Sequence, residues 1–104
     1  MSGEQPARET ILDSGVKVPQ HVVYRAFANE TVVLNLLTGK YHGLNPTGGR
    51  MLEVLEGAAK VREACATLAA EYDRPADEIE GDLYDFCLEL LEYGLIEVNG
   101  SVEL

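Results

Sequence analysis

Three short runs of β-branched and aromatic residues follow one another in the first half of the chain. They cover residues 21–28, 31–37 and 40–44, with Asn29-Glu30 and Thr38-Gly39 between them. Asn and Gly tolerate the backbone angles of tight turns, whereas β-branched and aromatic residues favour strands. The pattern therefore predicts three antiparallel strands that are joined by two tight turns.

The spacing of apolar residues becomes helical after residue 44. Asn45-Pro46 combines a strong N-cap with the residue preferred at the first helical position, so a helix is predicted from here to Gly57. Further apolar residues at helical spacing predict a second helix over residues 61–72 and a third over residues 76–93. The order favours an α+β fold, with a three-stranded antiparallel sheet followed by a three-helix bundle.

Both ends of the chain lack a long periodic pattern. Residues 1–15 are mostly polar, and we expect them to form a flexible N-terminal lead-in. The alternation at residues 16–18 and the apolar run at residues 95–98 predict two short extended pieces. A single domain is therefore expected over residues 16–100.

The third predicted helix has three faces. At about 100° per residue, one face carries carboxylates and the opposite face carries an apolar stripe that is expected to face the core. A third set of residues repeats at the same spacing, and it covers a neighbouring element or forms one wall of a binding groove. The carboxylate ridge is Glu78, Asp82, Asp85, Glu89 and Glu92; the core stripe is Ile79, Leu83, Phe86, Cys87 and Leu90; the third set is Tyr84, Leu88 and Leu91.

The chain of 104 residues is strongly acidic, with 18 Asp and Glu against 8 Lys and Arg and a formal net charge of −10. Proteins that bind nucleic acids or anionic membranes use Lys and Arg, so both classes of partner are disfavoured. No apolar run is long enough for a membrane span and no secretory signal is visible, so we expect a cytoplasmic protein. The charge favours a basic partner, or it serves solubility alone.

Few residues carry the usual signs of catalysis or metal binding. Cys65 and Cys87 lie in apolar helical patterns and form no CxxC pair, which favours structural burial. His21 and His42 have no paired second ligand, and Gly48-Gly49 lacks the context of a phosphate-binding loop. The carboxylates line one helix face rather than a cleft, which disfavours acid–base catalysis. From these observations together we expect no metal, no cofactor and no enzymatic activity.

The third predicted strand is an edge strand of the sheet. Residues 40–44 contain no proline and a single lysine, so little discourages another strand from pairing with them. An extended peptide that adds there would be held by main-chain hydrogen bonds, and pockets would read its alternate side chains. The pattern leaves open whether Tyr41 or His42 directs its amide outward.

Two segments of the chain resemble the PqqD-like family. Residues 32–55 read V-V-L-N-L-L-T-G-K-Y-H-G-L-N-P-T-G-G-R-M-L-E-V-L, and residues 79–96 show the pattern I-x-x-D-L-Y-D-F-C-x-x-L-x-x-Y-G-L-I. The family comprises the elements that recognise precursor peptides in pathways of ribosomally synthesised, post-translationally modified peptides. Through L-N-P-T-G-x-R the chain looks most like the free-standing lasso-peptide member, and it lacks the Gln- and Trp-containing signatures of the pyrroloquinoline-quinone member.

The resemblance implies a winged-helix-like fold and a binding protein without catalytic activity. In the family, the leader of the precursor peptide adds as a strand to the third strand and lies against the third helix. The implied partners are a basic, extended precursor leader and a cysteine-protease leader peptidase that removes it, with the cyclase as a further candidate. By position, the leader would pair with Lys40, Tyr41, His42, Gly43 and Leu44 and would face Asp82, Asp85, Phe86, Leu88 and Glu89.

Two other functions remain open. A winged-helix fold also occurs in DNA-binding regulators, which need a basic recognition helix, whereas residues 71–97 hold ten acidic residues and one basic residue, Arg74. The other is a PqqD-type peptide chaperone that serves a different modifying enzyme. The sequence determines neither the precursor, nor the surface that meets the peptidase, nor the oligomeric state.

Overall fold

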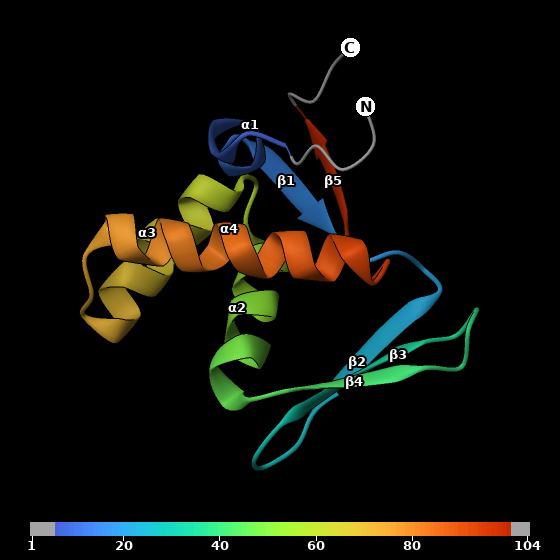
Figure 1. Cartoon of the computed structure of the whole chain (residues 1–104). Helices are drawn as coiled ribbons and strands as arrows, with labels where there is room; N and C mark the ends of the chain where they lie inside the picture. The colour runs from blue at the N-terminus through green and yellow to red at the C-terminus, as the bar shows by residue number, and fades with distance from the viewer. Residues whose placement is uncertain (1–5, 101–104) are drawn as a thin grey trace.

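The computed structural model describes residues 6–100 and shows strands and helices in the predicted order (Figure 1). A short helix that was not predicted comes first, and two short strands overlap the extended pieces predicted at residues 16–18 and 95–98. In chain order the elements of this part are α1 (Arg8–Leu12), β1 (Ser14–Lys17), β2 (Val22–Ala26), β3 (Thr31–Asn35), β4 (Tyr41–Leu44), α2 (Pro46–Gly57), α3 (Val61–Tyr72), α4 (Ala76–Glu92) and β5 (Glu97–Gly100).

Strands β2, β3 and β4 form the predicted antiparallel sheet, with β3 in the centre. Thr31, Val33 and Asn35 of β3 are buried, and the residues between them are half-buried, so one face of the sheet packs on the core. The strands are shorter than the predicted runs because the ends of those runs lie in turns. For example, the Phe27 N–H donates to the Glu30 carbonyl at 2.7 Å across the β2–β3 turn.

The three predicted helices are confirmed. Helix α2 begins where the Asn45 side chain accepts a hydrogen bond from the Gly48 N–H at 2.7 Å. It packs so closely on β3 that a Cβ on Gly49 would lie only 2.2 Å from Thr31 Oγ1. Helix α3 ends at Asp73, whose φ of 54° places it in the left-handed region.

The N-terminal segment differs from the expected flexible lead-in over residues 1–15. Residues 1–5 lie outside the described residues, but Arg8–Leu12 is helix α1, and Ile11 and Leu12 are fully buried in the core. Strand β1 then pairs antiparallel with β5, with Val16 opposite Val98. A helix of five residues is too short to show a period, and its burial depends on contacts with α3 and α4, which local pattern does not reveal.

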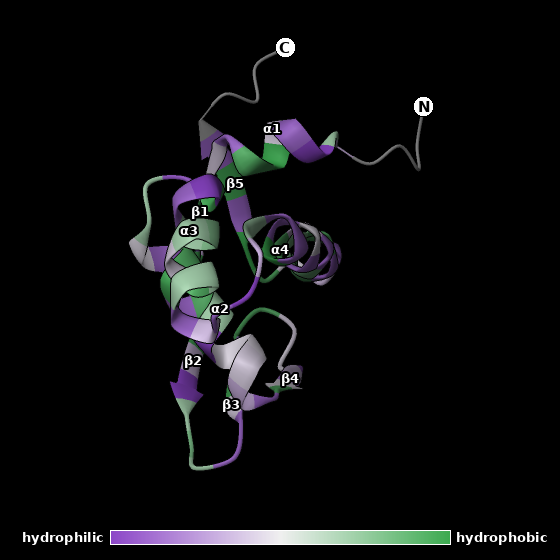
Figure 2. Cartoon of the chain, turned by 90° about the vertical axis from the view of Figure 1, so that its left-hand side faces the viewer, coloured by the Kyte–Doolittle hydropathy of each residue, from purple (hydrophilic) through white to green (hydrophobic). Residues whose placement is uncertain are grey.

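The helices separate two small sheets. The β1–β5 ribbon and the β2–β3–β4 sheet lie at opposite ends of the molecule, and α4 crosses between them (Figure 1). Figure 2 views α4 almost along its axis and shows one side of it turned towards α2 and α3. The predicted core stripe of α4 is confirmed, since its members Ile79, Leu83, Phe86, Cys87 and Leu90 are all buried. The fold is therefore the predicted α+β arrangement, extended by α1, β1 and β5.

Candidate functional site

Strand β4 has an open outer edge. Among residues 6–100 only β3 pairs with it, while β1 and β5 pair with each other at the far end of the molecule. The chain's own described ends therefore leave this edge accessible. An edge of this kind presents unpaired backbone groups that can form hydrogen bonds with another strand.

The hairpin hydrogen bonds show which amides of β4 point outward. The Asn35 N–H donates to the Lys40 carbonyl at 2.9 Å, so these residues form a hydrogen-bonded pair. Such pairs alternate along an antiparallel ladder. With Val33 opposite His42 in the register, the backbone of His42 faces β3, and the N–H and C=O groups of Tyr41 and Gly43 point to the open edge.

Helix α4 directs one of its faces to β4. The His42 ring stacks against the Tyr93 ring, with centroids 4.6 Å apart, and Tyr93 is the C-cap residue of α4. Two turns earlier, the Phe86 ring lies 3.7 Å from the position that a Cβ would take on Gly48, which belongs to the first turn of α2. Glu89 stands between Phe86 and Tyr93 on the same helix face. Figure 2 shows α4 and β4 on the same side of the molecule.

The carboxylates of α4 are not equivalent. Near its start, Arg74 forms ion pairs with Glu78 and Asp82, each at 3.1 Å. Asp85 and Glu89 are exposed, and neither forms an ion pair within residues 6–100. Within the carboxylate ridge, the residues without an ion pair among residues 6–100 therefore lie in the second half of the helix.

The third set of α4 residues does not form one continuous wall. The Tyr84 hydroxyl donates to the Pro6 carbonyl at 2.6 Å, and the Arg8 guanidinium lies over its ring at 5.9 Å. Leu91 packs against the core. Leu88 is half-buried and stands about 200° around the helix from Phe86, so it faces away from β4.

The structure brings together most, but not all, of the predicted site residues. Tyr41, His42, Gly43 and Leu44 form β4, and Lys40 is the exposed residue before it. Phe86, Glu89 and Asp85 lie on or beside the facing side of α4. Asp82 is held by Arg74, and Leu88 is on another side of the helix.

Tyr93 is a site residue that the sequence pattern did not single out. It is 48% exposed and it contacts β4 through His42. The available signal was its place seven residues after Phe86, which puts both aromatic rings on the same helix face. Only the tertiary structure shows that β4 lies opposite this face.

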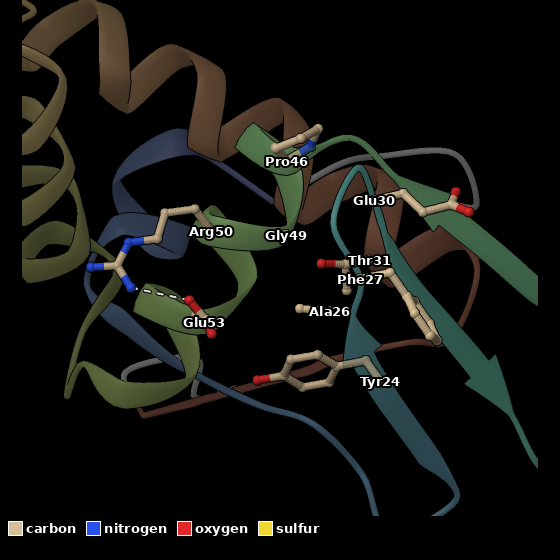
Figure 3. Close-up of a pocket in the computed structure, with 9 residues that line it drawn as sticks. All are labelled: Tyr24, Ala26, Phe27, Glu30, Thr31, Pro46, Gly49, Arg50 and Glu53. Atoms are coloured by element: carbon tan, nitrogen blue, oxygen red, sulfur yellow. Dashed lines mark hydrogen bonds and ion pairs between the residues drawn. The ribbon is translucent and has the colours of Figure 1, made fainter.

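A separate pocket of about 320 Å³ lies between α2 and the β2–β3 hairpin (Figure 3). In this figure Tyr24 reaches from β2 towards α2, where Arg50 is bonded to Glu53. The Tyr24 hydroxyl is hydrogen-bonded to Glu56, and Arg50 also pairs with Glu71 at 2.8 Å. The Tyr24 hydroxyl and the Arg50 guanidinium that line the pocket therefore already have partners among the described residues.

The two cysteines of the chain, Cys65 and Cys87, are buried. Burial raises the pKa of the Cys65 thiol to about 11 and that of the Cys87 thiol to about 12, so neither is a thiolate near neutral pH. Within residues 6–100, no three His, Cys, Asp or Glu side chains are grouped to hold a metal ion. No helix in this part is both long and apolar enough to cross a membrane.

The three-stranded sheet, the following helices and the open edge beside α4 define a winged-helix-like α+β domain. A family model described as coenzyme PQQ synthesis protein D (PqqD) matches residues 30–96, and the chain belongs to this family. The matched region runs from the residue before β3 to the residue before β5 and includes both sides of the candidate site. The resemblance noted from the sequence is thus confirmed.

Two solved structures share the fold. One is TbiB1 in complex with the TbiA(beta) leader peptide, which is 34% identical, has a TM-score of 0.72, and matches over 78% of this chain and 94% of that chain. The other is a lasso peptide synthetase B1 complexed with the leader peptide, with 20% identity, a TM-score of 0.71, and 79% and 96% coverage. At 20% identity the second comparison shows the fold alone. No curated protein matches the chain.

Proposed function

We propose that this protein captures the leader of a ribosomal precursor peptide by strand addition to β4 and presents it to a leader peptidase in lasso-peptide biosynthesis. The observation that carries the proposal is the open edge of β4, where Tyr41 and Gly43 direct their backbone groups outward beside α4. The 34% identical neighbour is a complex with a leader peptide, which supports this assignment.

The backbone of the edge suits an extended guest of any sequence. A strand that pairs with Tyr41 and Gly43 gains main-chain hydrogen bonds, each worth about 0.5–1.5 kcal/mol net. Its side chains then alternate between the side of the sheet that faces α4 and the outer side. Side chains on the first side meet Phe86, Glu89 and Tyr93.

The charge of the site favours a basic guest. Asp85 and Glu89 are exposed on α4 without an ion pair among residues 6–100, in a chain of net charge −10. Exposed pairs of this kind contribute little individually, but several of them raise the rate of encounter and select the sign of the partner's charge. Lys and Arg side chains of a leader are the matching groups.

The protein acts in this scheme by binding alone. Its two cysteines are buried with raised thiol pKa values, so the chemistry of leader removal belongs to the cysteine-protease partner. Binding a flexible leader as a fixed strand presents the adjoining cleavage site to that partner in one conformation. The cyclase would act on the released core peptide afterwards.

Calorimetry tests the proposal. The full chain is titrated with a synthetic leader peptide from the neighbouring precursor gene, with and without the leader peptidase. We expect saturable binding with one leader per chain, and faster leader cleavage by the peptidase when the chain is present. Absence of leader binding would overturn the proposal, and binding without any effect on cleavage would restrict it to capture.

A further inference from the structure

Asn35, the last residue of β3, is the centre of a hydrogen-bond network in the turn that leads into β4. Its side-chain oxygen accepts hydrogen bonds from the Leu37 N–H at 2.9 Å and from the Thr38 N–H at 3.4 Å. Its backbone N–H donates to the Lys40 carbonyl at 2.9 Å, and its carbonyl accepts from the Gly39 N–H at 2.8 Å. One residue therefore holds most of the connection between the two strands.

The β3–β4 turn, residues 36–40, is exposed, whereas Asn35 is only 7% exposed. An Asn side chain that accepts backbone amides two and three residues ahead imposes a turn conformation on the chain. The two large apolar residues of the turn, Leu36 and Leu37, do not pack against the core. The turn therefore depends on Asn35, rather than on burial, for its shape.

The side chains of β4 specify its pairing register only weakly. Tyr41 is 73% exposed, Gly43 has no side chain, and His42 and Leu44 are half-buried. A strand that buries little on either face can slip along its neighbour, and in a hairpin the turn sets the register. The register of β4 therefore depends on the β3–β4 turn.

A slip of β4 by one residue would exchange its two sides. The N–H and C=O groups of His42 would then point to the open edge, and those of Tyr41 and Gly43 would face β3. The His42 side chain would also turn away from Tyr93, although the two ring centroids now lie 4.6 Å apart. A leader strand would meet the wrong backbone groups and the wrong side chains at this edge.

We infer that Asn35 is a positioning residue for leader binding, which holds the register that presents Tyr41 and Gly43 to the leader. This inference rests on the proposed function. Asn35 does not itself contact the leader, because β3 is the central strand and lies two strand spacings, about 10 Å, from a strand on the outer edge of β4. Its effect on leader affinity is transmitted through the pairing of β4 with β3.

The test compares two variants of Asn35 with a matched control. Asn35→Ala removes the oxygen that accepts the two turn amides, whereas Asn35→Asp keeps an acceptor at the same place. The control Asn45→Ala removes a bond of the same kind, from the Gly48 N–H at 2.7 Å, which caps α2 and is not part of the turn. Leader affinity is measured by calorimetry, and amide hydrogen exchange of β4 by nuclear magnetic resonance without and with leader.

Amide exchange in the absence of leader reports the register directly. In the unmodified chain we expect the His42 amide to exchange slowly, since it bonds to β3. The Tyr41 and Gly43 amides should exchange fast until leader is added. Asn35→Ala should lower the protection of the His42 amide and weaken leader binding, each by about tenfold or more.

The other two variants separate register from general stability. Asn35→Asp should stay within about threefold of the unmodified chain in both measurements, because the turn amides keep their acceptor. Asn45→Ala should lower the thermal midpoint through the lost cap but also stay within about threefold in both measurements.

Normal leader affinity and normal His42 protection in folded Asn35→Ala would overturn the inference while leader capture stands. Equal losses in Asn35→Ala and Asn45→Ala would overturn it as well, because they would reflect general destabilisation. Failure of the unmodified chain to bind leader would instead overturn the proposed function.

If Asn35→Ala proves unfolded by circular dichroism, Gly39→Val decides the outcome. Gly39 has a φ of 76°, which a β-branched residue rarely adopts, and nothing lies within 4 Å of its Cβ position. The substitution therefore strains the turn without disturbing the core. We expect the same losses of His42 protection and leader affinity, and unchanged values of both would overturn the inference.

Discussion

Tyr41 and His42 are neighbours in β4, but their backbone amides serve opposite sides of the strand. The His42 backbone faces β3, where it maintains the sheet, and the Tyr41 amide points to the open edge. Proline removes the N–H and suits only positions where that donor is not used in the sheet. The two residues therefore form a matched pair for testing strand addition.

We expect Tyr41→Pro to weaken leader binding by tenfold or more, because one hydrogen bond to the leader is lost and the proline ring hinders the approach of the leader strand. The thermal midpoint should change little. His42→Pro should lower the thermal midpoint, because it removes a bond between β4 and β3. Calorimetry with leader and thermal denaturation followed by circular dichroism measure the two effects. Normal leader affinity of folded Tyr41→Pro would exclude pairing at this edge.

The buried thiols make stability depend on pH in the alkaline range. The pKa values of Cys65 and Cys87 rise from about 9 when unfolded to about 11 and about 12 in the folded chain. Both states hold the proton below pH 9, so the full stability is present there. Between pH 9 and about 11 the unfolded chain loses these protons first, and the free energy of unfolding falls.

We expect the urea midpoint of the unmodified chain to decrease between pH 9 and 10.5. A Cys65→Ala/Cys87→Ala double variant should be less stable at pH 7.5, because it loses buried volume, and should show a shallower decrease at high pH. Equal slopes for the two proteins would show that the thiols do not control the alkaline transition. The pKa of Tyr24 is also raised, by burial and by its bond to Glu56, and it adds to the decrease in both proteins.

At the scale of elements, α4 combines three functions on its different sides. Its apolar stripe packs on the core, its first turns are tied to Arg74, and its second half presents carboxylates and aromatic rings towards β4. The stripe and the carboxylate ridge were predictable because both follow the helical period within one element. Which side faces β4 was not, since it depends on how a distant strand packs.

Reversing the free charges of α4 tests the electrostatic part of leader binding. Asp85→Lys/Glu89→Lys should weaken binding of a basic leader by about tenfold and flatten its dependence on salt between about 50 and 500 mM. The control Asp77→Lys/Glu97→Lys makes the same change in net charge at exposed positions outside the site. An equal loss in both variants would indicate that net charge, rather than these two residues, governs the affinity.

At the scale of the whole molecule, residues from both ends of the chain complete the core. Leu12 is fully buried, and β1 pairs with β5 after more than seventy intervening residues. The helical core is thereby closed on the side opposite the β2–β3–β4 sheet (Figure 1). A chain that began at residue 16 would lose α1 and part of β1.

Leu12→Ala should lower the free energy of unfolding by about 2–5 kcal/mol, because it leaves a cavity in the core. Leu37→Ala makes the same chemical change in the β3–β4 turn, where the side chain is 76% exposed, and should alter stability by less than about 0.5 kcal/mol. Urea denaturation measures both. Similar midpoints for the two variants would show that α1 contributes little to the core.

Local rules of the sequence determined the strands, the three long helices and their ends, because caps, turns and periodicity act between residues only a few positions apart. They also determined the acidic charge and the residues that carry the family resemblance. Only the tertiary structure decided that the backbone amide of Tyr41, rather than that of His42, points to the open edge. It also decided that Arg74 forms an ion pair with Asp82 and that α1 is buried. Which amides of a strand bond to its neighbour, which charges form ion pairs and which residues are buried all depend on contacts between segments distant along the chain. No local pattern specifies these contacts.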